Sequence, residues 1–125
     1  MDTTATTLQD LADRYIAAWN ETDPAARRRL VDASWAEDAR YTDPLVAAEG
    51  RDAVDATLGA VQAQFPGLVF RLGGPVDAHH DIARFSWELG PAGGEALVVG
   101  FDVLVADAAG RIAQVHGFLD KVPAV

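Results

Sequence analysis

The first half of the chain has the apolar spacing of helices. Up to residue 20, apolar side chains recur every three or four positions, at Leu8, Leu11, Tyr15, Ala18 and Trp19. This spacing predicts an amphipathic helix that ends near Glu21 and carries Tyr15 on its inner face. Asp23 and Pro24 supply an N-cap and a first-turn proline, which predict a second helix through residues 26–35.

A third helix is predicted after Gly50. One of its faces is apolar, with Val54, Leu58, Val61 and Phe65. Pro66 and Gly67 should end it. Before this helix lies the segment YTDP, residues 41–44, which leaves room for no more than a single strand or turn. Pro44 keeps Asp43 out of helical geometry.

From residue 68 onward the apolar positions alternate, which is typical of strands with one apolar face. The alternating residues are Leu68, Phe70 and Leu72, then Ala83, Phe85, Trp87 and Leu89. The segment GPAGGE, residues 90–95, predicts a hairpin connection. Residues 96–106 are apolar on both faces apart from Asp102, which predicts a central strand covered on both sides. A turn over 107–110 leads to a last strand over 111–122.

The order of these elements predicts a single α+β domain over residues 1–125, with neither an internal repeat nor a low-complexity linker. Three N-terminal helices followed by a curved antiparallel sheet would form a cone whose concave face the helices close. Asp102 shares a strand face with Val98, Gly100 and Leu104. It should therefore point into the space that the cone encloses, or into a covered outer interface.

Asp102 is the position at which this pattern needs a chemical explanation. A buried carboxylate must be paired, hydrogen-bonded or protonated. In the structural interpretation Arg84, a tryptophan N–H or a loop amide satisfies it, because most buried polar groups are simply satisfied. In the functional interpretation it is a neutral carboxylic acid that donates a hydrogen bond to a substrate oxygen from an apolar pocket.

Composition narrows the classes of protein. The 125 residues include 19 acidic and 10 basic side chains, a formal charge of −9. Such a surface repels phosphate backbones and anionic lipid, so we expect no nucleic-acid or membrane partner. The N-terminus lacks the features of a signal peptide, and the absence of cysteine fits a cytoplasmic protein. Abundant Ala, Arg, Val and Gly are typical of a bacterial source.

The sequence contains few signs of a metal-binding or cofactor-binding motif. His79 and His80 suggest a metal site, but adjacent strand residues point to opposite faces, and neither HxH nor HxxxH spacing accompanies them. The chain also lacks GxSxG, P-loop and dinucleotide fingerprints. We therefore expect no metal and no cofactor.

Several segments, in this order and spacing, resemble the SnoaL-like branch of the nuclear-transport-factor-2-like superfamily, which includes ketosteroid isomerase. They are RYIAAWNETD, WAEDARYTDP, EGRDAV, GGPVDAHH and FDVLVADAAGRI. The resemblance covers nearly the whole chain. It implies a curved sheet around a pocket capped by helices, a small hydrophobic ligand, and a homodimer formed through the outer face of the sheet.

The resemblance also implies roles for individual residues. Asp43 matches the proton-shuttling base, and Tyr15 and Asp102 match the two donors to the developing enolate oxygen. Asp43 before Pro44 equally fits a turn cap, and Tyr15 equally fits a core position. The residues expected to line the pocket are Trp19, Trp35, Phe65, Phe85, Trp87, Leu89, Val98, Gly100, Val115, Gly117 and Leu119. His116, on the outward face opposite Val115, is a fallback acid-base candidate.

The match also has departures. Leu58 and Trp35 stand where the isomerase has tyrosines that support its catalytic tyrosine, and Trp87 replaces a smaller residue, which predicts a cavity too shallow for a steroid. Three hypotheses follow. The chain is an isomerase or polyketide-type cyclase of small hydrophobic ketones, an epoxide hydrolase that would need Arg84 in the pocket, or a non-catalytic ligand-binding or dimerisation module.

Overall fold

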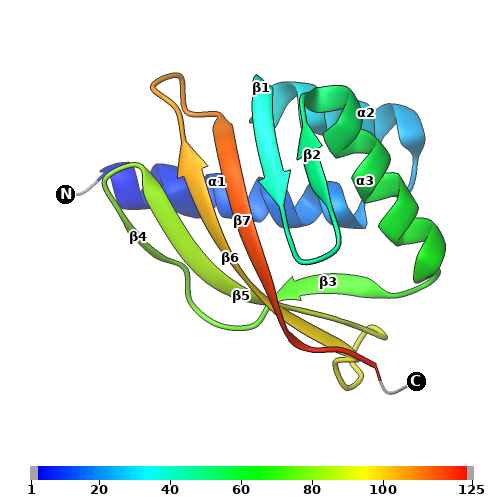
Figure 1. Ribbon diagram of the computed structural model, residues 1–125. Helices are drawn as coiled ribbons and strands as arrows, with labels where there is room; N and C mark the ends of the chain where they lie inside the picture. Colours follow the sequence, from blue (N-terminus) through cyan, green and yellow to red (C-terminus); the bar gives the residue numbers. More distant parts are fainter. Residues whose placement is uncertain (1–2, 124–125) are drawn as a thin grey trace.

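The computed structural model describes residues 3–123, with side chains from residue 7 onward (Figure 1). Its helices are α1 (Thr3–Asn20), α2 (Pro24–Ser34) and α3 (Arg51–Gln64). Its strands are β1 (Trp35–Thr42), β2 (Ala47–Glu49), β3 (Val69–Leu72), β4 (Asp77–His79), β5 (Ile82–Gly90), β6 (Val98–Ala106) and β7 (Ile112–Lys121). In the described residues these strands form one sheet of order β2-β1-β7-β6-β5-β3, with β4 paired to β5.

The three helices begin and end close to the positions that the sequence predicts. The Asp23 side chain accepts a hydrogen bond of 2.9 Å from the Ala26 N–H, and Pro24 occupies the first turn of α2. Gly50 precedes α3 with a φ of 87°, a left-handed conformation that favours glycine. The α+β architecture with three helices and a curved sheet is confirmed.

The sheet is mixed, so the predicted antiparallel arrangement is wrong for one pairing. Strand β1 runs parallel to β7, whereas the other pairings among the described strands are antiparallel. Six other elements separate β1 from β7 along the chain, so no tight hairpin turn forces the two strands to run antiparallel. This register places Tyr41 opposite Val115 and Thr42 opposite His116.

Strand β1 is longer than the single strand or turn predicted at YTDP. It begins at Trp35, which the sequence assigned to the end of the second helix. Trp35 and Ala36 are both buried, the next two residues are exposed, and the alternation resumes only at Ala39. A register shift between Trp35 and Arg40 accounts for this break. The irregularity conceals the period of two that identifies a strand.

Helix α1 lies behind the sheet in Figure 1, packed on β3, β4 and β5, while α3 packs on β1 and β2. The Gln62 side-chain amide of α3 donates to the carbonyls of Trp19 (3.0 Å) and Glu21 (2.8 Å) at the end of α1. The Asn20 side chain bonds both the N–H and the carbonyl of Phe70. These contacts fix the C-terminal ends of α1 and α3 beside β3.

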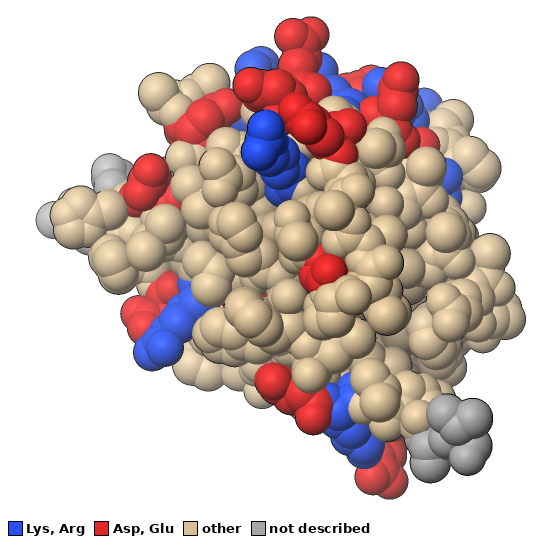
Figure 2. All heavy atoms as spheres, viewed as in Figure 1, with Lys and Arg blue, Asp and Glu red and all other residues tan. Residues whose placement is uncertain are grey.

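The two faces of β6 differ in burial. Val98, Gly100, Asp102 and Leu104 are buried on the inner face, while the outward residues between them are half-buried. Within one chain, β6 is therefore fully covered on its inner face and only partly covered on its outer face. On the outer face of the sheet, charged side chains are few over the middle and are concentrated around the edges (Figure 2). None of the helices in the described range is long and apolar enough to cross a membrane.

Candidate active site

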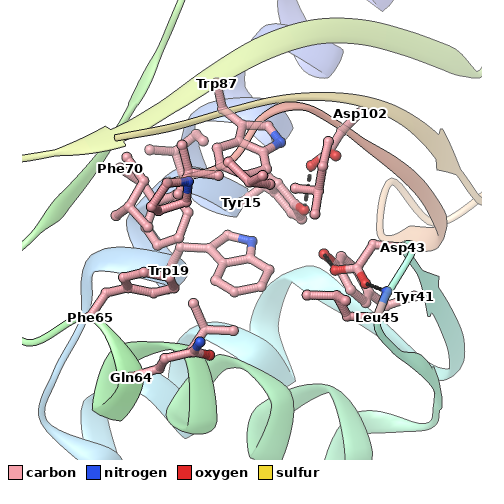
Figure 3. Close-up of a pocket in the computed structure, with 17 residues that line it drawn as sticks. Tyr15, Trp19, Tyr41, Asp43, Leu45, Gln64, Phe65, Phe70, Trp87 and Asp102 are labelled. Atoms are coloured by element: carbon pink, nitrogen blue, oxygen red, sulfur yellow. Dashed lines mark hydrogen bonds between the residues drawn. The ribbon is translucent and has the colours of Figure 1, made fainter. Parts of the chain in front are cut away.

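A cavity of about 240 Å³ opens between the helices, the inner face of the sheet and the C-terminal segment (Figure 3). Its residues come from α1, β1, the β1–β2 loop, α3 and the residue after it, β3, β5, β6, β7 and the segment after β7. They are Tyr15, Ile16, Trp19, Tyr41, Asp43, Leu45, Val61, Gln64, Phe65, Phe70, Trp87, Leu89, Val98, Asp102, Leu119, Val122 and Pro123. Asp102, Tyr15, Asp43 and Tyr41 gather on one side, and aromatic residues form the opposite side.

Asp102 is buried on the inner face of β6, with 2% of its surface exposed. The Tyr15 hydroxyl donates to its Oδ2 at 2.6 Å. Burial raises the pKa of Asp102 to about 6, and the negative charge of Asp43 adds to this rise. Hydrogen bonds from Tyr15 and the Trp87 indole oppose it. The partners of Asp102 are thus the Tyr15 hydroxyl and a tryptophan N–H, that of Trp87, and the Asp102 carboxyl lines the cavity.

Tyr15 is held by aromatic side chains on the inner face of α1. Its ring centroid lies 5.8 Å from Trp35 and 5.6 Å from Phe85, with Trp19 at 6.1 Å. Burial, followed by the charge of Asp102, raises the pKa of the Tyr15 phenol well above its ordinary value. The hydroxyl therefore remains protonated at neutral pH and acts as a hydrogen-bond donor.

Asp43 combines the two interpretations that the sequence left open. Its Oδ1 accepts hydrogen bonds from the backbone N–H groups of Leu45 (2.8 Å) and Val46 (2.9 Å), as a turn cap does. Its Oδ2 accepts from the Tyr41 hydroxyl at 2.6 Å. The same carboxylate lines the cavity. Among the described residues Oδ2 has one donor, so it keeps acceptor capacity for a ligand.

Tyr41 is a site residue that the sequence pattern did not predict, because YTDP resembles a turn and the irregularity in β1 hides its inward position. It is buried on the inner face of β1. Burial and the hydrogen bond to Asp43 raise the pKa of its phenol well above the ordinary value. Tyr41 and Asp43 form a second tyrosine–aspartate pair beside that of Tyr15 and Asp102.

Gly117 of β7 allows the two acids to lie close together. A Cβ at this position would lie 2.9 Å from Asp102 Oδ1 and 3.2 Å from Asp43 Cβ. Any side chain here would therefore displace one of the two carboxylates. Gly117 does not line the cavity as predicted, but its missing side chain makes room for the polar side of the site.

Nine of the predicted site residues lie at the cavity. Besides Tyr15, Asp43 and Asp102, they are Trp19, Phe65, Trp87, Leu89, Val98 and Leu119. The prediction is wrong for Trp35, Phe85 and Val115, which are completely or almost completely buried behind the wall. They share an inward face with lining residues, but the cavity does not extend along the whole of that face.

Gly100 also lies behind the wall, and it controls the position of Trp87. The two residues are paired across β5 and β6, and a Cβ on Gly100 would lie 2.1 Å from a ring carbon of Trp87. The indole can therefore lie flat against β6. In this position Trp87 lines the cavity beside Phe70, with ring centroids 5.5 Å apart, and limits its depth.

Three of the other lining residues come from segments without regular secondary structure. Leu45 belongs to the β1–β2 loop, and Val122 and Pro123 follow β7. Leu45 and Val122 are 81% and 58% exposed at the rim. Ile16, Val61, Gln64 and Phe70 complete the wall. Of these, only Val61 and Phe70 occupied apolar positions in the predicted pattern.

The histidines and Arg84 lie outside this cavity. His116 is exposed on the outer face, where its Nε2 lies 3.0 Å from Gln114 Oε1, so it cannot act as the fallback acid-base group of this cavity. Arg84 pairs with Asp77 at 3.0 Å on the surface. In the described part of the chain, the cavity wall contains neither arginine, lysine nor histidine.

The prediction that His79 and His80 point apart is wrong. His80 follows β4 with a φ of 50°, so its ring turns back and the two Nδ1 atoms lie 3.0 Å apart. Among the described residues, no group of three or more metal-binding side chains surrounds them or lies elsewhere.

Comparisons with known proteins agree with this architecture. The chain matches the SnoaL-like domain over residues 12–115. A proposed isomerase of the SnoaL-like family from Agrobacterium tumefaciens is 43% identical, with 92% of this chain and 98% of that chain covered and a TM-score of 0.87. None of the curated proteins searched matches the chain.

More distant structures share the fold alone. A proposed SnoaL-like polyketide cyclase from Jannaschia is 16% identical, covers 96% of this chain and 90% of its own, and has a TM-score of 0.73. An NTF2-like protein of unknown function from Cytophaga hutchinsonii is 13% identical, with 90% and 88% covered and a TM-score of 0.67. From the domain match and the 43% identical structure, we conclude that the chain belongs to the SnoaL-like family.

Proposed function

We propose that this protein is an enzyme that moves a proton next to the carbonyl group of a small hydrophobic molecule, as an isomerase or a cyclase does. The observation that carries the proposal is the buried pair of Tyr15 and Asp102, 2.6 Å apart, at the wall of a largely apolar cavity that also contains Asp43. A base and two hydrogen-bond donors around one cavity are what enolate chemistry requires.

The proposed reaction begins with the substrate carbonyl oxygen between Tyr15 and Asp102. Asp43 Oδ2 takes a proton from the neighbouring carbon, and the electron pair of that C–H bond forms the enolate double bond. The carbonyl electron pair moves to oxygen, where Tyr15 and protonated Asp102 donate hydrogen bonds. In an isomerase Asp43 then returns the proton to another carbon. In a cyclase the enolate carbon attacks a second carbonyl of the same molecule, and the oxygen of that carbonyl takes the proton from Asp43.

Asp102 must be protonated to act as the second donor. Its pKa of about 6 lies close to neutral pH, so a modest further rise keeps the acid neutral. An enolate oxygen beside it provides this rise, because a neighbouring negative charge disfavours ionisation of the carboxyl. Substrate charge and Asp102 protonation therefore support each other.

The cavity volume indicates the size of the substrate. A volume of about 240 Å³ is below the roughly 300–1,000 Å³ of common ligand pockets. Trp87 and Phe70 close the apolar end. The geometry therefore favours a compact ketone or lactone of one or two rings, with its oxygen toward Tyr15 and its apolar body toward the aromatic side.

A non-catalytic ligand-binding module is the second candidate. It is favoured by the hydrogen bonds within the cavity wall, because the Tyr15 hydroxyl is bonded to Asp102 and Asp43 is bonded to Tyr41 and two backbone N–H groups. An epoxide hydrolase is less consistent with the site because Arg84 lies outside it.

We also propose that the protein pairs with a second copy of itself through the outer face of the sheet. Phe118 is 57% exposed there and lies opposite Phe101 of β6. The middle of this face carries few charges although the chain has a net charge of −9 (Figure 2). Two copies could therefore meet there without bringing many acidic side chains together.

Binding of 2-naphthol, followed by its fluorescence, tests the proposed site because its oxygen resembles an enolate oxygen on a compact apolar body. We expect Tyr15→Phe and Asp102→Leu each to weaken binding about tenfold, since each removes a hydrogen-bond donor to the naphthol oxygen. Thr57→Val is the control, because it removes a hydroxyl from α3 outside the cavity. Binding that is indifferent to both cavity variants would contradict the proposal.

A further inference from the structure

Tyr41 connects the two acidic groups of the cavity. Its hydroxyl donates to Asp43 Oδ2 at 2.6 Å and lies near enough to the Tyr15 hydroxyl to interact with it. Tyr15 in turn donates to Asp102 at 2.6 Å. Each of the two tyrosines thus donates its single proton to an aspartate, which leaves the Tyr15 oxygen as a second acceptor for the Tyr41 proton.

The aromatic packing fixes the two tyrosines relative to each other. The Tyr41 ring lies 5.7 Å from Trp19 and 6.5 Å from Trp35. The Tyr15 ring contacts the same two tryptophans, at 6.1 Å and 5.8 Å. Both hydroxyls are therefore held in place while each O–H bond remains free to rotate.

Tyr41 has one proton and two oxygen atoms to which it can donate. The backbone N–H groups of Leu45 and Val46 hold Asp43 Oδ1 in a fixed geometry, so they cannot follow a change in its charge. Tyr41 can follow it, because rotation of the O–H bond moves its hydrogen bond from Asp43 Oδ2 to the Tyr15 oxygen. Of the two acceptors, Asp43 Oδ2 and the Tyr15 oxygen, the Tyr41 proton goes to the one that carries or lies closer to negative charge.

We propose that Tyr41 is a positioning residue whose hydroxyl switches from Asp43 to Tyr15 as the proton moves from substrate to base. This inference rests on the proposed function. Before the transfer the negative charge is on Asp43, and Tyr41 stabilises it there. After the transfer Asp43 is neutral and the charge is on the substrate oxygen, so Tyr41 donates to Tyr15 and strengthens the bond that Tyr15 gives to that oxygen.

Asp43→Asn reproduces the state after the transfer. The asparagine carbonyl can still accept from the backbone N–H groups of Leu45 and Val46, so its NH₂ group replaces Oδ2. An NH₂ group donates and does not accept. It therefore turns the Tyr41 proton toward Tyr15 without any substrate reaction.

The test is a double-mutant cycle on the affinity for 2-naphthol. In the otherwise wild-type protein, we expect Asp43→Asn to strengthen binding about tenfold, because it removes a neighbouring negative charge and redirects Tyr41. In the Tyr41→Phe background, Asp43→Asn should strengthen 2-naphthol binding about threefold or less, because only the loss of the Asp43 negative charge still acts. Thr57→Val replaces Tyr41→Phe in the control cycle and should leave the tenfold gain unchanged.

The outcomes separate this inference from the proposed function. Equal gains from Asp43→Asn in both Tyr41 backgrounds, with binding still dependent on Tyr15 and Asp102, overturn the Tyr41 switch alone. If Tyr15→Phe and Asp102→Leu leave the affinity for 2-naphthol unchanged, both the proposed function and the Tyr41 switch are overturned.

A spectroscopic measurement covers the case in which Tyr41→Phe does not fold. The chain contains two tyrosines, so ¹³Cζ labelling of tyrosine gives two resonances in the NMR spectrum. We expect Asp43→Asn to shift both of them, because Tyr15 gains a hydrogen-bond donor when Tyr41 turns. A shift of the Tyr41 resonance alone overturns the proposal.

Discussion

Asp102 is the residue whose protonation links the stability of the protein to its proposed chemistry. Folding raises its pKa from 3.8 to about 6, so the folded state binds this proton more tightly than the unfolded state. Its contribution to stability is fully present below about pH 4 and is lost as pH rises through 6. The buried acid should therefore cost stability at neutral pH.

Asp102→Asn should remove this pH dependence. Relative to the wild type, the free energy of unfolding of the variant should rise by about 3 kcal/mol between pH 4 and pH 8. Urea unfolding at the two pH values measures the difference. The control is Asp107→Asn, because Asp107 caps an exposed turn through the Ala109 and Arg111 N–H groups. If the free energies of unfolding of Asp102→Asn and wild type differ by the same amount at both pH values, folding does not raise the pKa of Asp102.

Part of the site chemistry was predictable from single residues. An acid inside the apolar stretch 98–106 stood out without any structure, and the family resemblance supplied Tyr15 and Asp43. The Tyr41 partner of Asp43 is only two residues away, so this contact is local. It was not predicted because residues 41–44 indicate only a single strand or turn, and the irregular burial over residues 35–39 hides the strand that carries Tyr41.

At the scale of elements, the pairing of β5 with β6 determines the depth of the cavity. Trp87 lies flat because Gly100 opposite it has no side chain. Gly100→Ala should lower the free energy of unfolding by about 1–3 kcal/mol, since the indole must move. Denaturant unfolding measures this loss, and the loss should shrink in a Trp87→Leu background.

A matched glycine provides the control for that cycle. A Cβ on Gly74 would come no closer than 3.9 Å to another group, so Gly74→Ala should change stability by less than about 0.5 kcal/mol. An equal cost of Gly100→Ala with and without the indole would show that Trp87 is not held by this glycine.

Elements with regular periodicity were predictable, and irregular ones were not. The apolar stripes gave the helices to within a residue or two, and alternation gave β5. Strand β1 was hidden by its bulge, and the parallel pairing with β7 has no signature within either strand. The rim residues Leu45 and Val122 lie in a loop and a terminal segment, where burial follows from the fold and not from the local sequence.

At the scale of the whole molecule, the distribution of charge predicts assembly. If two copies pair through the outer face of the sheet, Phe118→Asp should weaken the dimer about tenfold or more, because it places a charge on a buried apolar contact. Sedimentation equilibrium measures the dissociation constant. Leu45→Asp is the control, since Leu45 is 81% exposed at the cavity rim. A wild-type protein that sediments as a monomer would contradict the proposed dimer.

The most direct test of the central claim is proton exchange in the absence of a known substrate. Small cyclic ketones in D₂O lose the ¹H NMR signal of their α-protons when an enzyme abstracts and returns them. We predict exchange above the buffer rate with the wild type, at least a hundredfold slower exchange with Asp43→Asn, and no change with the turn-capping control Asp107→Asn. Exchange that is equal in wild type and Asp43→Asn, or no faster than in buffer, would contradict the account and favour a ligand-binding module.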